Sequence, residues 1–284
     1  MTKMTIGVLN PGEMGSEVAA CARAAGARVV WASAGRGDAT QKRAAAAGLE
    51  DVGSIRDLAA ASDVILSVCP PDAALDLARA VAATGFRKLY VDGNAVSPTT
   101  ARTIAGVIEG AGATFIDGGI IGPPPRTRGT TRLYVSGAGA TQVKALFGDS
   151  ALEVMVLDAP AGAASAVKMA YAAWTKGTSA LILSVRALAA AEGVDEALLG
   201  EWRISQQALP KRSEDAVAGN ARKAWRFVGE MEEIAATFAA AGLPDGFHKA
   251  AAEVYRRMGR YKDTPTPSMA DVAAALTATR PRRS

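Results

Sequence analysis

Lys168 is the side chain in this sequence with the clearest potential for proton chemistry. It stands in a run of small and apolar residues that begins at Gly162, continues to about Val194 and contains no proline. Such a run predicts one long helix that is apolar on most faces and therefore buried. An ammonium group there either extends its stem to water or has a shifted pKa and exchanges a proton with a substrate. Ser165 and Tyr171 each lie three residues from Lys168 and share its helix face, so Lys168 and Tyr171 are our candidate catalytic residues.

A glycine turn near the start of the chain has the spacing of a dinucleotide-binding loop. Gly12 and Gly15 follow a strand predicted at Thr5–Asn10 and lead into a helix predicted at Ser16–Ala25. They match the second and third glycines of Gly-x-Gly-x-x-Gly, where one admits a pyrophosphate and the next allows close helix packing. Asn10 replaces the first glycine, and asparagine tolerates left-handed backbone angles. A tight turn without a ligand is the alternative. The candidate cofactor-binding residues of the loop are Asn10, Pro11, Gly12, Glu13 and Met14.

The end of the second predicted strand, Ala27–Trp31, bears on the choice of cofactor. NAD-binding sites usually place an Asp or Glu there for the ribose hydroxyls, whereas this chain has Ser33 and Arg36. A hydroxyl and a guanidinium suit a 2′-phosphate, so we expect NADP(H) to be favoured over NAD(H). The alternative is an arginine in an exposed loop.

Later loops also follow predicted strands. Ligands of open α/β sheets bind at the carboxyl ends of the strands, although proline and asparagine there are also ordinary turn residues. The candidate cofactor-binding residues of these loops are Val68, Cys69, Pro70 and Asn94. A rigid glycine and proline loop then separates two further strands, and its candidate substrate residues are Gly122, Arg126 and Arg128. The two arginines either meet an anionic substrate or face water.

The order of elements predicts two domains. Strands and helices alternate up to residue 160, which is typical of a Rossmann-type doubly wound α/β sheet. Residues 161–284 show helical patterns only, with separators at Gly193–Asp195, Leu209–Lys211, Gly242–Pro244 and Pro265–Pro267. We therefore expect an NAD(P)-binding domain at 1–160 and an all-helical domain at 161–284. The glutamates at 230, 232 and 233 and the single histidine, His248, receive no role.

Composition argues against several classes of protein. A chain of 284 residues that is 49% hydrophobic can bury a sizeable core. The net charge is only +4 and the basic end, Arg280–Ser284, is interpreted as a frayed tail, so no nucleic acid is expected. Cys21 and Cys69 are far apart and predict neither a disulfide nor a metal site, which fits a reducing cytoplasm. Three basic residues interrupt the long apolar run, so no membrane span is expected, and no signal peptide is predicted.

These motifs resemble those of the β-hydroxyacid dehydrogenase superfamily, which includes 3-hydroxyisobutyrate dehydrogenase, 6-phosphogluconate dehydrogenase and the imine reductases. The resemblance covers nearly the whole chain. Asn10–Gly15 is similar to the family's cofactor loop, Asp117–Gly137 to its substrate-loop motif and Gly162–Lys168 to its catalytic helix. Lys168 falls on the catalytic lysine. The family's substrate-loop serine is Ile121 here, and the asparagine four residues after the lysine is Ala172.

The resemblance implies an NADP(H)-dependent oxidoreductase that transfers hydride between nicotinamide and a small carbonyl or secondary alcohol substrate, with Lys168 as general acid and base. An imine reductase that uses Tyr171 and a non-catalytic NADP-binding protein are the alternatives. The family's late Lys-Asp pair falls on Gly229 and Glu230, as in a bacterial subgroup with a poorly characterised helical domain. Family members are dimers or tetramers, which implies a homodimer through the helical domain. The identity of the substrate does not follow from the sequence.

Overall fold

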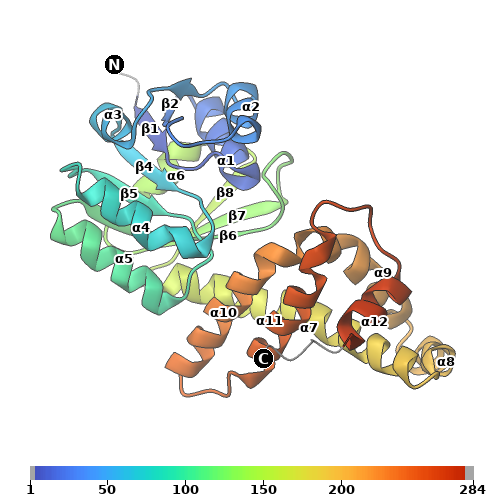
Figure 1. Ribbon diagram of the computed structural model, residues 1–284. Coiled ribbons are helices and arrows are strands. Elements are labelled where there is room, and N and C mark those ends of the chain that lie inside the picture. Colours follow the sequence, from blue (N-terminus) through green and yellow to red (C-terminus); the bar gives the residue numbers. More distant parts are fainter. Residues whose placement is uncertain (1–3, 279–284) are drawn as a thin grey trace, which may run out of the picture. The chain divides into compact units, whose positions relative to one another are not determined.

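The computed structural model describes residues 4–278, and the chain forms two compact units. The first is α/β and extends to Tyr171, and the second begins at Ala172 and is helical (Figure 1). The division falls within helix α7 (Ala163–Ala191), eleven residues after the boundary expected at residue 160. The segment Arg280–Ser284 lies outside the described residues.

One sheet organises the α/β unit. Its eight described strands run in the order β3-β2-β1-β4-β5-β6-β7-β8. Neighbours are parallel except for β6 and β7, which are antiparallel. The first six positions follow the Rossmann order, so the predicted doubly wound sheet is confirmed. The strands are β1 (Thr5–Val8), β2 (Arg28–Trp31), β3 (Glu50–Asp51), β4 (Val64–Ser67), β5 (Leu89–Asp92), β6 (Thr114–Ile121), β7 (Thr131–Ser136) and β8 (Leu152–Val156).

Helices cover both faces of this sheet (Figure 1). The side chains of β4 are buried on both faces of the sheet: Val64 and Leu66 belong to one buried cluster, and Ile65 belongs to another. The first cluster contains α1 and α6 side chains such as Val18 and Phe147, and the second contains residues of α3, α4 and α5. The sequence of a strand that is buried on both faces is a continuous run of apolar residues. The helices are α1 (Glu13–Ala24), α2 (Asp38–Ala46), α3 (Ile55–Ala61), α4 (Pro71–Ala82), α5 (Pro98–Gly110) and α6 (Thr141–Phe147).

The helical unit is held partly by two basic residues of α7. Arg186 is 6% exposed and donates to both carboxylate oxygens of Asp195 on α8 and to Ser213 on α9. Lys176 pairs with Glu230 on α10. Such pairing compensates the cost of burying a charge. The described helices after α7 are α8 (Asp195–Ser205), α9 (Leu209–Asn220), α10 (Ala224–Ala240), α11 (Gly246–Met258) and α12 (Met269–Thr277), with short 3₁₀ turns at Ala221–Lys223 and Gly259–Tyr261.

One detail corrects the sequence interpretation. Leu209–Lys211 was expected to separate helices, but these residues form the first turn of α9, where Pro210 needs no N–H partner. Among residues 4–278, no helix combines the length and hydropathy that a membrane span requires.

Candidate functional site

The loop between β1 and α1 fits a dinucleotide. A Cβ built on Gly15 would lie 2.3 Å from the Asn10 carbonyl oxygen, so only glycine lets α1 pack against this loop. A Cβ on Gly12 would instead face open space, with Asn10 Nδ2 3.9 Å away. Gly12 at the N-cap of α1 has no side chain to cap the helix, and the first N–H groups of a helix can receive an anion. The loop thus offers the backbone cradle that a pyrophosphate requires.

The structure gives Asn10 a different role from the one expected. No residue other than glycine has a positive φ in the described chain, so Asn10 does not adopt the left-handed conformation. Its side chain oxygen instead accepts from Arg36 Nη1 at 3.4 Å. In the same loop Pro11 is buried, Glu13 is exposed and Met14 packs against the core cluster that contains α1.

Two arginines lie over this loop. Arg36 Nη2 donates to the Leu9 carbonyl oxygen at 3.1 Å, and Arg43 Nε of α2 donates to the Pro11 carbonyl oxygen at 3.4 Å. Sequence reasoning missed Arg43, which lies inside a helix where no loop motif marks it. Ser33 lies close by, and its backbone N–H donates to Asp51 at 3.2 Å. Asp51 lies on β3. The hydrogen bonds of its carboxylate with Ser33 and with the Gly53 N–H hold the pKa of Asp51 below its usual value.

Asn94 organises the next part of the same sheet edge. Its amide nitrogen donates to Ser67 at the end of β4, and its oxygen accepts from the Cys69 N–H at 2.6 Å. The fully buried side chain therefore fixes the loop of Val68, Cys69 and Pro70, and its role as a cofactor ligand stays a prediction. Within this loop Val68 is buried and Pro70 is exposed. Burial raises the pKa of the Cys69 thiol to about 12, which leaves it unreactive at neutral pH.

Asp92 is a buried acid beneath this edge. Its Oδ1 accepts from the Asn94 N–H at 2.9 Å, while its Oδ2 has no hydrogen-bond partner among residues 4–278. Burial raises its pKa to about 7, and the charge of Asp117 on the neighbouring strand adds to the effect. Asp92 therefore keeps its proton at mildly acidic pH.

Lys168 lies at this same edge of the sheet. Strand β6 pairs Asp117 with Asp92, the last residue of β5, and continues beyond it to Gly119 and Ile121. A Cβ on Gly119 would lie 2.9 Å from the Lys168 Cβ, so α7 contacts β6 directly. A Cβ on Gly93 would contact Ile120 at 3.5 Å and Val68 at 3.4 Å. Gly93 thus approaches both Val68 and β6, the strand that Lys168 also approaches.

The other two residues of the predicted helix face lie in different environments. Tyr171 is 48% exposed. Ser165 is fully buried, and its hydroxyl donates to Asp117 Oδ1 at 2.5 Å. Ser165 therefore anchors the helix and does not line a site next to Lys168.

The predicted substrate loop follows β6. Gly122 has φ +126°, and a Cβ there would lie 2.3 Å from the Thr130 carbonyl oxygen, so the loop closes on itself at this glycine. Arg126 pairs with Glu17 of α1 at 2.7 Å and is largely exposed. Arg128 lines a hollow along β8. The substrate roles of Arg126 and Arg128 stay predictions.

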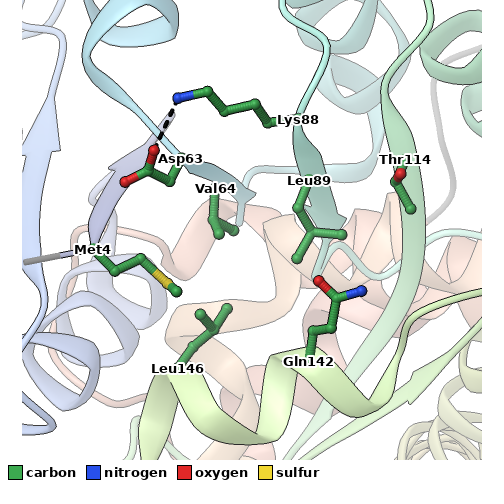
Figure 2. Close-up of a pocket in the computed structure, with 8 residues that line it drawn as sticks. All are labelled: Met4, Asp63, Val64, Lys88, Leu89, Thr114, Gln142 and Leu146. Atoms are coloured by element: carbon green, nitrogen blue, oxygen red, sulfur yellow. Dashed lines mark hydrogen bonds and ion pairs between the residues drawn. The ribbon is translucent and has the colours of Figure 1, made fainter. Parts of the chain in front are cut away.

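A cavity at the opposite edge of the sheet has little bearing on catalysis. Figure 2 shows Val64, Leu89 and Thr114, the first residues of three parallel strands, around a space of about 310 Å³. An ion pair between Asp63 and Lys88 lies at its side (Figure 2). Ligands of doubly wound sheets bind at the carboxyl ends of strands, and this cavity is at the amino ends. In the described chain no group of three His, Cys, Asp or Glu side chains is arranged to hold a metal.

Two family models match the chain. Residues 5–158 match the NAD binding domain of 6-phosphogluconate dehydrogenase, and this match includes the glycine loop, Arg36, Arg43 and β6. The chain belongs to this family. Residues 189–258 match a domain of unknown function (DUF1932), in agreement with the expected subgroup. The predicted membership of the β-hydroxyacid dehydrogenase superfamily is thus confirmed, and a nicotinamide dinucleotide is the cofactor that the α/β unit accommodates.

Individual proteins resemble the chain over different lengths. An uncharacterised 28.5 kDa protein encoded in the 7S RNA 5′ region of Methanothermus fervidus is 32% identical over 167 residues. That match covers 58% of this chain and 63% of the relative, which is less than two thirds of the relative's length.

Solved structures resemble the chain over nearly its whole length. A conserved protein of unknown function, described as similar to 3-hydroxyacid dehydrogenases, is 27% identical, with a TM-score of 0.66 and coverage of 90% of this chain and 99% of that one. A 3-hydroxyisobutyrate dehydrogenase from Mycobacterium tuberculosis, solved with L-serine, is 20% identical, with a TM-score of 0.69 and coverage of 98% and 100%. A reductive aminase from Aspergillus terreus, solved with NADPH and ethyl levulinate, is 19% identical, with a TM-score of 0.58 and coverage of 95% and 98%. The last two share the fold.

Proposed function

We propose that this chain is an NADP(H)-dependent oxidoreductase that transfers hydride between nicotinamide and a carbonyl or secondary alcohol, with Lys168 as general acid and base. The observation that carries the proposal is the contact between Lys168 and Gly119. Gly119 lies near the carboxyl end of β6, at the sheet edge where β1 and β4 lead into the glycine loop and the Val68–Pro70 loop, which supports a role for Lys168 at that edge.

The proposed chemistry needs a proton as well as a hydride. The bound nicotinamide supplies or receives the hydride. During reduction the substrate oxygen gains negative charge, and the Lys168 ammonium donates a proton to it. During oxidation the neutral amine accepts the hydroxyl proton. General acid and base catalysis of this kind contributes about 10²- to 10⁴-fold to the rate.

The preference for NADP(H) is supported by Ser33, Arg36 and Arg43. Both guanidinium groups donate to oxygens of the cofactor loop at 3.1 to 3.4 Å, and a 2′-phosphate would be a stronger acceptor than these neutral oxygens. A hydrogen bond between charged groups contributes about 1.5–3 kcal/mol, or about 10- to 100-fold in affinity.

Fluorescence titration with NADPH and NADH tests this preference. We expect Arg36→Ala and Arg43→Ala each to weaken NADPH binding by about 10- to 100-fold and to leave NADH binding nearly unchanged, because NADH lacks the 2′-phosphate. Arg79→Ala is the matched control, since Arg79 is exposed and pairs with Asp76 on α4. Equal affinity of the unaltered protein for both cofactors, or unchanged discrimination in both variants, would reject the preference.

The substrate is proposed to be a small molecule, and the replacement of the family's serine by the buried Ile121 favours one with an apolar part near β6. An imine is the second candidate class, since Tyr171, one turn after Lys168, is 48% exposed. Turnover of a panel of carbonyls, secondary alcohols and imines, measured from NADPH absorbance, distinguishes between these substrate classes. Turnover of imines alone would favour Tyr171 as donor, and cofactor binding without any turnover would indicate a non-catalytic protein.

We further propose that the protein is a cytoplasmic homodimer formed through the helical unit. Trp174, Leu181 and Leu188 recur every seven residues along α7 and are 66%, 49% and 63% exposed. A seven-residue spacing gives one apolar stripe along the helix, which suits self-association about a two-fold axis. Cys21 and Cys69 are both free thiols, as a reducing compartment would leave them.

A further inference from the structure

We propose that Asp117 is the positioning residue for Lys168, because its carboxylate binds the first turn of α7 and so fixes where the lysine stands. The inference rests on the proposed function, in which Lys168 handles a proton, and it adds a residue that has no proposed role in that chemistry. Asp117 does not touch the reacting atoms. It acts through the helix.

The carboxylate of Asp117 receives several donors of the α7 start. Its Oδ2 accepts from the Gly162 N–H at 2.9 Å and from the Ser165 N–H at 3.0 Å. Its Oδ1 accepts from the Ser165 hydroxyl at 2.5 Å. The first N–H groups of a helix have no partners within the helix, and they carry the positive end of its dipole. A carboxylate is therefore the strongest available acceptor for them, and Asp117 is 1% exposed.

Strand β7 completes the anchor. The Ser136 hydroxyl donates to Asp117 Oδ2 at 2.9 Å and accepts from the Ala164 N–H at 3.1 Å. Asp117 on β6 and Ser136 on β7 thus hold residues 162 to 165, at the start of α7, against the sheet. Lys168 follows Ser165 by three residues, which is just under one helical turn, so little freedom remains between the anchor and the lysine.

Gly119 sets the height of the helix above the sheet. It lies two residues after Asp117 on β6, so both point to the same face. A Cβ on Gly119 would approach the Ala164 carbonyl oxygen to 2.7 Å and the Lys168 Cβ to 2.9 Å. Asp117 therefore pulls the start of α7 towards β6, and the absence of a side chain at Gly119 gives Lys168 room beside the strand.

Amide hydrogen exchange tests the anchor directly. Asp117→Asn keeps the shape of the side chain, but its amide oxygen is neutral, so the Gly162 and Ser165 N–H groups, which both donate to Oδ2, lose their charged acceptor. We expect the Gly162 and Ser165 amides to exchange about 10- to 100-fold faster. This factor corresponds to the loss of a hydrogen bond to a charged group, which makes local opening of the start of α7 easier. Unchanged exchange at both amides would overturn the proposal.

Kinetics with the best substrate of the panel separate positioning from plain stability. We expect Asp117→Asn to lower kcat by about 100-fold, because small misplacements of a catalytic group have effects of this size, while the Kd for NADPH stays within about twofold. Gly119→Ala should have the same effect by displacing the helix with the carboxylate intact. It provides the test if Asp117→Asn does not fold.

The matched control is Asp63→Asn. Asp63 also accepts a backbone N–H, that of Thr5 at 2.9 Å, but at the amino edge of the sheet. We expect a lower melting temperature and an unchanged kcat. If Asp117→Asn and Gly119→Ala likewise lose only thermal stability while Lys168→Ala loses kcat, the positioning role is wrong and the proposed function stands. If Lys168→Ala retains its kcat, the proposed function fails, and the exchange rates alone decide whether Asp117 anchors the helix.

Discussion

At the scale of single residues, the acid beneath the cofactor edge makes a prediction about pH. Asp92 is fully buried, and burial raises its pKa from 3.8 to about 7. Below about pH 4 the folded and unfolded chains both hold this proton. As the pH rises towards 7 the unfolded chain releases the proton and the folded chain keeps it, so the free energy of unfolding falls over this range. Each pH unit corresponds to about 1.4 kcal/mol, so the total reaches at most a few kcal/mol.

Asp92→Asn should remove this cost, because the amide oxygen still accepts from the Asn94 N–H and carries no charge. We expect the variant to be more stable than the unaltered protein at pH 8, by on the order of 1–3 kcal/mol, with the difference vanishing near pH 4. Urea unfolding of both proteins across this range measures the difference. A variant that is less stable at pH 8, or a difference that does not depend on pH, would contradict the assignment.

Single residues also show where sequence reasoning stops. Lys168 was found because an ammonium group is an anomaly in an apolar run, and Gly12 and Gly15 because their spacing matches a known loop. Arg43 has no such signal, and Asp117 and Gly119 were noted only as part of the Asp117–Gly137 motif, without a role for either. Each matters only because the fold brings it against a residue that is distant in the sequence.

At the scale of elements, the turn from β1 into α1 depends on a missing side chain. A Cβ on Gly15 would lie 2.3 Å from the backbone oxygen of Asn10, and backbone cannot move aside as a flexible side chain can. We expect Gly15→Ala to cost about 1–3 kcal/mol of stability and to weaken NADPH binding by at least about tenfold, because the loop must shift.

Gly106→Ala is the control for this prediction. Gly106 is an exposed glycine of α5 whose Cβ would meet nothing within 4 Å among the described residues. Alanine there should stabilise the chain by about 0.5–1 kcal/mol through helix propensity, with NADPH binding unchanged. Urea unfolding and cofactor titration measure both effects. Normal NADPH affinity in Gly15→Ala would show that the loop does not require the glycine.

The elements themselves were largely predictable where hydrophobic patterning is strong. The long helix predicted from Gly162 to about Val194 is α7, which ends at Ala191. The two-residue strand β3 has no pattern of its own, because Glu50 and Asp51 are both exposed and pair only at the sheet margin. Asp51 was consequently missed, although it accepts from the Ser33 N–H.

At the scale of the whole molecule, the apolar stripe of α7 predicts self-association. We expect sedimentation velocity to show a dimer, and Leu181→Glu to weaken it by at least about 100-fold, because a charge would be buried without a partner. Ala190→Glu is the control, since this residue is exposed on the same helix half a turn away from the stripe. A monomer at all concentrations, or equal effects of the two substitutions, would contradict the proposed interface.

The order of the chain explains why the fold could be predicted and the substrate could not. Alternating strands and helices followed by helices alone indicate a Rossmann sheet and a helical region, and the topology confirms the sheet. Substrate contacts depend instead on loops such as the one that carries Arg126 and Arg128. In the structure Arg126 pairs with Glu17 of α1, which no sequence pattern indicated.

The central claim is that Lys168 handles the proton of the reaction, and the most direct measurement is steady-state kinetics of Lys168→Ala with the best substrate of the panel. We expect kcat to fall by about 10²- to 10⁴-fold while the Kd for NADPH barely changes, and we expect Lys144→Ala, at an exposed lysine of α6, to behave like the unaltered protein. Retention of most of kcat by Lys168→Ala would contradict the claim, and a loss of kcat in Tyr171→Phe alone would assign the proton to the tyrosine.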